Sequence, residues 1–466
     1  MEKYGALTIF FLLPQIATQL DFGVIATGTR VMAMFQAQSK IDFRIKVFWE
    51  VMFALILIGL LQVMLFTFFS RDLMRVLQLD LVLATQITDV IVATSCWIFV
   101  SLIGAGVSIA ARAFERFKLL ATIQALNVSM FWFGAWGLAV IKPDIVLIIW
   151  CGVLSSVVTT LLLIYNVRKT IKLSADILRS NQALLLPNYF HFSAGTFVGQ
   201  ASSLLTYHAD KFLVAALISP AAVGIYNVCA SIASKMLVLV SAMATFSFPR
   251  AVRLHSEGAV DELSDVYLRA TRASVLVAMI IGAPLASLAE PFLHLWLKDA
   301  YQDEYAVVLI LMVMGYLLAS FSVVASNISI GMGMVRMPAL FALVGGGSTL
   351  ILCMVLAPKW GLYGAVTASV VGMSQALIFN WLVAKRLGNE QEKQAIHFSM
   401  SIMLIWSITT FSISQISYLI TSWFLLILSG VAIMLMLIYL WFICGLATEN
   451  ERQAWIQLLE KINGNN

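Results

Sequence analysis

Long apolar runs recur from one end of the chain to the other, separated by short polar connections. An apolar helix of roughly 20 residues crosses the hydrocarbon core of a membrane. A membrane barrel would need alternating strands with one polar face, whereas runs such as Val47–Phe69 are apolar on both sides. The pattern therefore predicts membrane-spanning helices at 4–21, 47–69, 86–110, 119–141, 144–166, 189–217, 222–248, 270–297, 304–329, 338–357, 362–384, 398–419 and 422–446.

The basic residues are unevenly distributed over the connections between these thirteen spans. If the connection 22–46 is cytoplasmic, the connections on that side carry 21 of the 29 Lys and Arg residues, and those on the other side carry 6. Cytoplasmic loops of membrane proteins are enriched in Lys and Arg. The bias therefore supports both the number of spans and an amino end on the outer side.

Composition excludes a soluble fold and gives no sign of a bound metal or cofactor. The chain is 61% hydrophobic and 11% charged, whereas soluble domains are about half apolar and a quarter charged. The basic residues behind the net charge of +5 lie in short loops, so membrane orientation explains them better than nucleic-acid binding. Asn127-Val-Ser matches a glycosylation acceptor but lies inside a predicted span and is given no weight. The cysteines all lie in apolar runs without a CxxC pair and are interpreted as small hydrophobic residues: Cys96, Cys151, Cys229, Cys353 and Cys444.

Two pairs of segments suggest an internal duplication. In the first pair a glycine leads through an apolar span to an arginine, with an offset of 220 residues; in the second a lysine and a proline precede a glycine-containing span, with an offset of 215 residues. A unit of six helices gives parallel repeats, with the substrate passage between two bundles; chance recurrence of glycines and basic residues is the alternative. The pairs are Tyr4-Gly5 to Arg30 with Gly224-Ile-Tyr226 to Pro249-Arg250, and Lys142-Pro143 with Pro358-Lys359. We predict an N-terminal bundle at 1–180, a C-terminal bundle at 181–390, an additional helix pair at 391–446 and a cytoplasmic tail at 447–466.

Polar residues within two neighbouring spans are the first candidates for a substrate site. They recur at helical spacing, which places them on one face of each helix, and two such faces would line a hydrated cavity. Close packing of small hydroxyl residues between helices is the alternative. A lysine near mid-span, Lys235, requires an anionic partner, either Asp210 or a substrate phosphate. The two rows are Ser193, Thr196, Gln200, Ser203, Tyr207, Asp210 with Lys211, and Asn227, Ser231, Ser234, Lys235, Ser241, Thr245.

A glycine-containing segment ends the first predicted span. Asp21 and Arg30 bracket it, and Gly23 and Gly28 would let the helix bend there. Arg30 is a candidate contact for a lipid phosphate or a substrate pyrophosphate, or serves as an orientation anchor.

Several motifs together resemble the polysaccharide exporter branch of the multidrug and oligosaccharidyl-lipid flippase superfamily. The resemblance covers nearly the whole chain, although each motif is loose by itself. The family's chains begin with a further helix, and Tyr4-Gly5 matches the point just after it. The motifs are Leu20-Asp-Phe-Gly23 through Arg30, Asp210-Lys-Phe-Leu, Pro220-Ala-Ala-Val-Gly-Ile-Tyr226, Phe248-Pro-Arg250, Leu295-Trp-Leu after Pro291, Ser329-Ile-Gly-Met-Gly333 and Pro358-Lys-Trp-Gly-Leu-Tyr-Gly-Ala365.

The resemblance implies a flippase of the bacterial cytoplasmic (inner) membrane. Such a protein moves an undecaprenyl-diphosphate-linked oligosaccharide, an O-antigen (lipopolysaccharide) or exopolysaccharide repeat unit, outward by alternating access through a cationic cavity. By the same resemblance, Arg30, Lys211 and Lys235 would contact phosphate or sugar, with Asp210 as partner. Gln200, Tyr207 and Asn227 complete the expected cavity. The expected partners are the lipid-linked substrate, the bilayer, a coupling proton or sodium ion, and a polysaccharide polymerase with its assembly proteins.

Two other functions remain open. A multidrug exporter of the same fold would need acidic groups at mid-depth to bind cations, whereas the deepest charge here is Lys235. A membrane glycosyltransferase or polymerase would need catalytic acids or a large outer loop, and only Asp299, Asp303 and Glu304 gather on that side. Because no GxxxxGK[ST] motif occurs, ATP is not expected to drive the process directly, and we expect no enzymatic activity.

Overall fold

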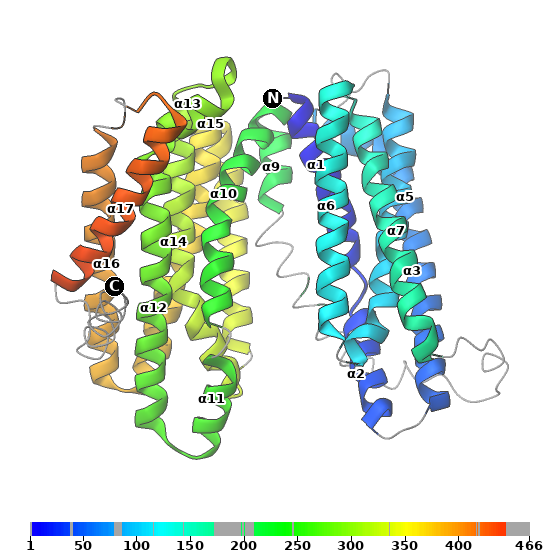
Figure 1. Cartoon of the computed structure of the whole chain (residues 1–466), viewed down its shortest axis with the longest axis horizontal. Coiled ribbons are helices and arrows are strands. Elements are labelled where there is room, and N and C mark those ends of the chain that lie inside the picture. Colours follow the sequence, from blue (N-terminus) through cyan, green and yellow to red (C-terminus); the bar gives the residue numbers. More distant parts are fainter. Residues whose placement is uncertain are drawn as a thin grey trace, which may run out of the picture. The chain divides into compact units, whose positions relative to one another are not determined.

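The chain forms two compact units, residues 1–224 and 225–466. All elements of regular structure in the part that can be described are helices, which confirms the predicted all-α polytopic class (Figure 1). The computed structural model describes residues 2–37, 41–78, 86–114, 116–142, 144–171, 197, 200, 209–244, 247–334, 336–415, 417 and 420–443.

The first unit is built from long apolar helices that pack around α5. Its helix α5 contacts α1, α2, α3 and α7, while α6 lies mainly against α7 (Figure 1). Buried Leu55, Leu102 and Ile109 belong to a core shared by α2, α3, α5 and α7. The helices are α1 (Glu2–Gln19), α2 (Val24–Ala37), α3 (Ile41–Val76), α5 (Ile87–Ala113), α6 (Phe117–Ile141), α7 (Ile145–Ile171) and α9 (Ala209–Leu217).

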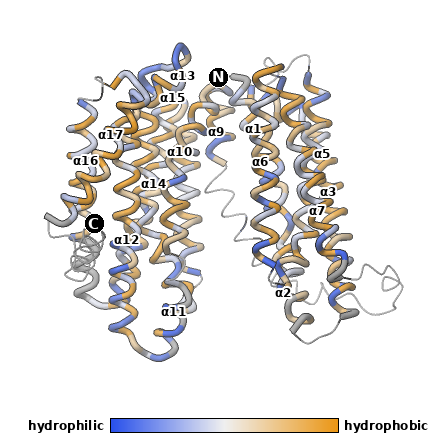
Figure 2. Tube along the Cα trace, viewed as in Figure 1, coloured by the Kyte–Doolittle hydropathy of each residue, from blue (hydrophilic) through white to orange (hydrophobic). Residues whose placement is uncertain are grey.

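The second unit packs α12, α14 and α15 against one another. Figure 2 shows hydrophobic residues along most of α14 and hydrophilic ones near α11, as expected for helices that cross a membrane and end in water. Buried Tyr267, Ile328 and Phe379 hold α12, α14 and α15 together. The elements are α10 (Pro220–Ala244), α11 (Ser247–Ser256), α12 (Val260–Ser287), α13 (Ala289–Leu297), η3 (Lys298–Ala300), α14 (Glu304–Gly331), α15 (Arg336–Leu387), α16 (Asn389–Ser414) and α17 (Trp423–Ile443).

Helix α15 doubles back on itself at Gly361. This residue has φ 56° and ψ −133°, a combination that glycine adopts far more readily than other residues. Gly364 and Leu356 lie against each other, and a Cβ on Gly345 would lie 2.8 Å from the carbonyl oxygen of Gly372. The two arms therefore pack closely, and they match the two spans predicted at 338–357 and 362–384.

Nine helices in the described ranges are long and apolar enough to cross a membrane, or ten if the bent pair α1 and α2 forms one span. Helix α15 counts once in this number despite its reversal. The span predicted at 189–217 lies mostly outside the described residues, as do the domain boundary after 180 and the tail 447–466. The arrangement as two parallel repeats stays a prediction.

Two predicted boundaries were wrong. The connection 22–46 is largely helical, because α2 and the first turn of α3 occupy most of it. The span predicted at 270–297 is broken at Leu288, between α12 and α13. A proline in the last turn of α12, Pro284, and another in the first turn of α13, Pro291, explain the break, because proline lacks the N–H that a continuous helix requires.

Candidate functional site

A sharp bend separates α1 from α2. The axis of α2 is bent by 47° from that of α1, and the break contains Phe22 at φ 54° and Gly23 at φ 74°. Asp21 is fully buried there. Its carboxylate accepts hydrogen bonds from the backbone N–H groups of Gly23 at 3.0 Å and Ile25 at 2.6 Å. Asp21 therefore caps the start of α2 and satisfies donors that the bend exposes.

Side chains from other segments hold this bend. The Gln62 amide on α3 donates to the carbonyl oxygens of Ala17 and Leu20, at 3.1 and 2.9 Å. The Gln200 side chain hydrogen-bonds to the Asp21 carboxylate, and the rings of Phe22 and Phe197 stack 5.0 Å apart. The bend predicted at Gly23 is thus confirmed, and side chains of α3 and of residues 197 and 200 hold it in place.

The bend predicted at Gly28 was wrong. Helix α2 passes through Gly28 without interruption. A Cβ on this residue would lie 2.6 Å from Cγ2 of Val51. Gly28 therefore permits close packing of α2 on α3 and provides no hinge.

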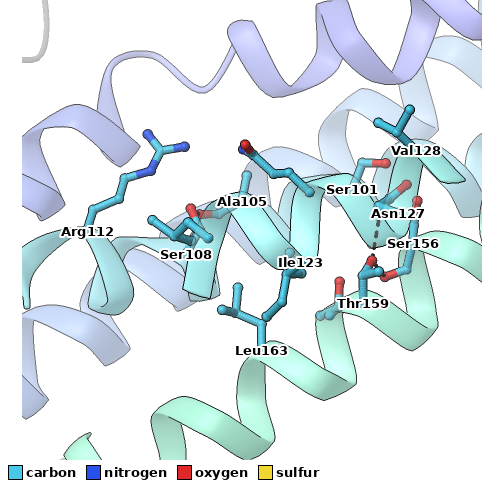
Figure 3. A pocket seen from close by; sticks show the side chains of 14 residues that line it. Ser101, Ala105, Ser108, Arg112, Ile123, Asn127, Val128, Ser156, Thr159 and Leu163 are labelled. Atoms are coloured by element: carbon cyan, nitrogen blue, oxygen red, sulfur yellow. Dashed lines mark hydrogen bonds between the residues drawn. The ribbon is translucent and has the colours of Figure 1, made fainter. Parts of the chain in front are cut away.

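A polar tract runs along the inside of α5, α6 and α7. It lines a cavity of about 470 Å³, shown in Figure 3. On α5 the residues Trp97, Ser101, Ala105, Ser108 and Arg112 follow each other by three or four positions, so they share one helix face. The polar members of the cavity wall, which we call the polar tract, are Ser101, Ser108, Arg112, Gln124, Asn127, Ser156, Thr159 and Thr160.

Asn127 is the central hydrogen-bonding residue of the polar tract. Its Nδ2 donates to Oγ1 of Thr159 at 2.9 Å, drawn as the dashed line in Figure 3. The hydroxyl of Ser155 donates to Asn127 Oδ1 at 3.5 Å. One turn away, Nε1 of Trp97 donates to Oγ of Ser156 at 3.0 Å. These bonds join α6 and α5 to α7 inside otherwise apolar helices.

A second cavity of about 290 Å³ continues the first. The two share Ser101, Asn127, Val128 and Ser156. The second cavity adds aromatic walls, since Phe11, Trp97 and Phe131 have ring centroids 4.9 to 5.7 Å apart. Arg112 lies at the other end of the polar tract (Figure 3). Among the described residues that line either cavity, none is acidic.

The described residues among those predicted from the sequence to form the substrate cavity do not line the polar tract. Arg30 is exposed on α2, and Lys235 is exposed on α10. Asn227 is half-buried on α10. Gln200 contacts Asp21 as described above. Their role in a substrate cavity stays a prediction.

The two charges at the start of α9 are half-buried. The Lys211 backbone N–H donates to Oδ1 of Asp210 at 2.9 Å, so Asp210 supports the first turn of its own helix. Tyr207 and the polar row from 193 to 208, apart from Gln200, lie outside the described residues.

Sequence reasoning missed the polar tract. Asn127 was recognised only as a glycosylation acceptor. The signal was nevertheless present, because Ser155-Ser156 and Thr159-Thr160 repeat at a spacing of four on α7, and all but Ser155 line the cavity. Hydroxyl residues at such spacing are common in ordinary helix packing, and only the contact with Asn127 distinguishes this group.

Comparison with known proteins gives one family match and several structural ones. A family model described as "Polysaccharide biosynthesis protein" matches residues 4–306. No match was found among curated proteins. An inward-facing multidrug resistance MATE family transporter of the MOP superfamily has a TM-score of 0.66 at 15% identity, covering 83% of this chain and 90% of its own.

Two further solved structures share the fold. The lipid II flippase MurJ in an inward closed conformation has a TM-score of 0.66 at 13% identity, covering 96% of this chain and 93% of its own. The Vibrio cholerae MATE transporter VcmN in its bent form has a TM-score of 0.54 at 14% identity, covering 83% and 88%. At these identities the likeness establishes the fold alone.

Proposed function

Because the chain belongs to the polysaccharide biosynthesis protein family, we propose that it is a membrane flippase for a lipid-linked oligosaccharide. The substrate is an undecaprenyl-diphosphate-linked repeat unit of an O-antigen or exopolysaccharide. It passes from the cytoplasmic to the outer leaflet of the bacterial inner membrane by alternating access. The protein moves this substrate and carries out no chemistry on it.

The observation that carries the proposal is the polar tract inside apolar helices. Uncompensated polar groups in a bilayer are costly and mark pathways for polar substrates. Amide and hydroxyl groups of Gln124, Asn127 and Ser156 offer both donors and acceptors, which suits a sugar. The positive charge of Arg112 suits a diphosphate.

The same observation disfavours export of cationic drugs. A cavity for organic cations within the membrane is expected to hold a carboxylate that pairs with the cation. The described lining of the polar tract holds Arg112 and no carboxylate. MATE transporters share the fold, but the positive charge of Arg112 in this lining would repel a cationic drug.

In the proposed cycle, Arg30, Lys211 and Lys235 contact phosphate or sugar, with Asp210 as an ionic partner, and Gln200, Tyr207 and Asn227 complete the cavity. A proton or sodium gradient supplies the energy. A polysaccharide polymerase receives the flipped unit in the outer leaflet.

Deletion of the gene in the native strain tests this function. We expect loss of surface polysaccharide and accumulation of its lipid-linked repeat unit. Sealed right-side-out vesicles treated with membrane-impermeant periodate should show that the accumulated sugars face inward. An unchanged surface polymer together with raised sensitivity to cationic drugs would instead favour the exporter.

A further inference from the structure

The polar tract and the adjoining aromatic cavity form one elongated site with three chemical zones. Trp97 and Arg112 stand at its ends, fifteen residues apart on α5, which is about 22 Å along a helix. The two cavities, about 470 and 290 Å³, together have the size of ligand sites in other proteins, roughly 300–1,000 Å³.

The aromatic zone lies at the end nearer α1. Phe131 is 8% exposed, and its ring centroid lies 5.6 Å from that of Trp97. Trp132, which is 55% exposed, also lines this cavity. Aromatic faces of this kind present a large rigid apolar surface, against which the C–H face of a sugar ring packs.

The middle zone has unused hydrogen-bonding capacity. Ser101 and Gln124 line the cavity, and neither side chain has a hydrogen-bond partner in the described part of the chain. Asn127 keeps a second amide hydrogen beyond its bond to Thr159. Within a bilayer such groups need partners from water or from a hydroxylated ligand.

The third zone is cationic. Arg112 is exposed at the last turn of α5, and none of the ion pairs among the described residues involves it. The charge bias of the loops predicts that this end of α5 is cytoplasmic. A guanidinium there matches the phosphate oxygens of a substrate that arrives from the cytoplasmic leaflet.

We propose that this site, inside the N-terminal unit, binds the saccharide head group of the substrate during transport. The sugar rings farthest from the carrier stack in the aromatic zone, hydroxyls of the rings nearer the carrier bond to Ser101, Gln124 and Asn127, and Arg112 holds the diphosphate. The proposal rests on the flippase function and adds to it a glycan subsite formed by α1, α5, α6 and α7. Ligands of this class are neutral, hydroxyl-rich and attached to an anionic carrier.

Site-specific photocrosslinking in the native strain tests the subsite. A benzophenone amino acid replaces Gln124, which faces the cavity, or Leu126, which is exposed on another face of α6. After irradiation, mass spectrometry of the α6 peptide identifies the adduct from the cell's own lipid-linked saccharides. We expect sugar and diphosphate mass at position 124 and phospholipid at 126. Only phospholipid at 124, or equal sugar adducts at both positions, would overturn the subsite.

A second variant tests whether the adduct at position 124 depends on a residue of the proposed site. Ser101→Ala leaves all described hydrogen bonds intact, so it should not affect folding. It should lower the sugar adduct at position 124 by about two- to tenfold, as expected for one neutral hydrogen bond. An unchanged adduct would remove Ser101 from the site. If the saccharide crosslinks at 124 although gene deletion leaves the surface polymer intact, the subsite stands and the flippase function fails.

Discussion

Asn127 on α6 and Thr159 on α7 are joined by a hydrogen bond of 2.9 Å. Helix α6 is otherwise little buried, since Phe131 and Ala135 are its buried residues. The hydrogen bond from Asn127 to Thr159 therefore contributes both to the association of α6 with α7 and to the shape of the polar tract.

Asn127→Ala should lower stability only slightly and transport strongly. Hydrogen bonds between membrane helices contribute about 0.6 kcal/mol on average, and Thr159 keeps its own bond to the Ser155 carbonyl oxygen. Thermal unfolding in detergent and surface polysaccharide measure the two effects. Thr122→Ala is the control, because that exposed hydroxyl bonds only to its own helix. Equal polymer from both variants would contradict a transport role for Asn127.

Gly152→Ala should destabilise the first unit. The new Cβ would lie 2.6 Å from Cη2 and Cζ2 of Trp97, and it would push the indole away from Ser156. Overpacking of this kind costs about 1–3 kcal/mol. Gly137→Ala is a matched control on α6, because nothing lies within 4 Å of the added atom. We expect a lower melting temperature for the first variant alone, and similar melting of the two would show that the Trp97 contact adapts without cost.

Gly361→Ala should weaken the hairpin of α15. Its φ of 56° with ψ −133° places a Cβ in a strained conformation, which costs roughly 1–3 kcal/mol. The yield and melting temperature of the purified protein report the effect. Gly347→Ala, in the same helix with open space around it, should behave like the parent protein. A stable Gly361→Ala protein would mean that the reversal tolerates another backbone conformation.

Asp21→Ala should destabilise the bend between α1 and α2. It removes the acceptor for the N–H groups of Gly23 and Ile25, and loss of such a cap costs about 0.5–2 kcal/mol. Asp21→Asn retains one acceptor oxygen and should recover part of the stability, as measured by thermal unfolding. The exposed Asp89 on α5 provides the control, since Asp89→Ala should have little effect. If Asp21→Asn melts as low as Asp21→Ala, the cap requires both oxygens.

Lys235→Ala should abolish surface polysaccharide while the protein remains inserted in the membrane, because the proposed role of the ammonium is to hold the diphosphate. Lys235→Arg should retain part of the polymer. Val238→Ala, one turn along the same exposed face of α10, controls for a general change at this surface. Normal polymer from Lys235→Ala would remove this residue from the transport path.

Much of the architecture follows from hydrophobic length alone. The spans at 304–329 and 422–446 agree closely with α14 and α17, because apolar runs of this length have few alternatives in a bilayer. Gly361 also separates two predicted spans at the observed reversal. Local composition fixes such features.

Features that depend on contacts between helices were harder to predict. Gly28 looked like a hinge, yet it serves packing against Val51. Phe22 adopts a positive φ, which nothing in its residue type suggests, because the surrounding bonds to Asp21 and Gln62 impose it. The structural role of Asn127 could not be predicted, because it depends on the hydrogen bond to Thr159 of α7. Periodicity gives the face of a helix but does not identify its neighbour.

The hairpin of α15 also bears on how the orientation of this protein can be mapped. Because Gly364 lies against Leu356 across the reversal, the turn has no room for an inserted epitope tag or reporter enzyme. An insertion at Gly361 would force the two arms apart, and its signal would describe a disrupted hairpin. The turn at Gly258, where nothing lies within 4 Å of an added Cβ, is a better place for such a reporter.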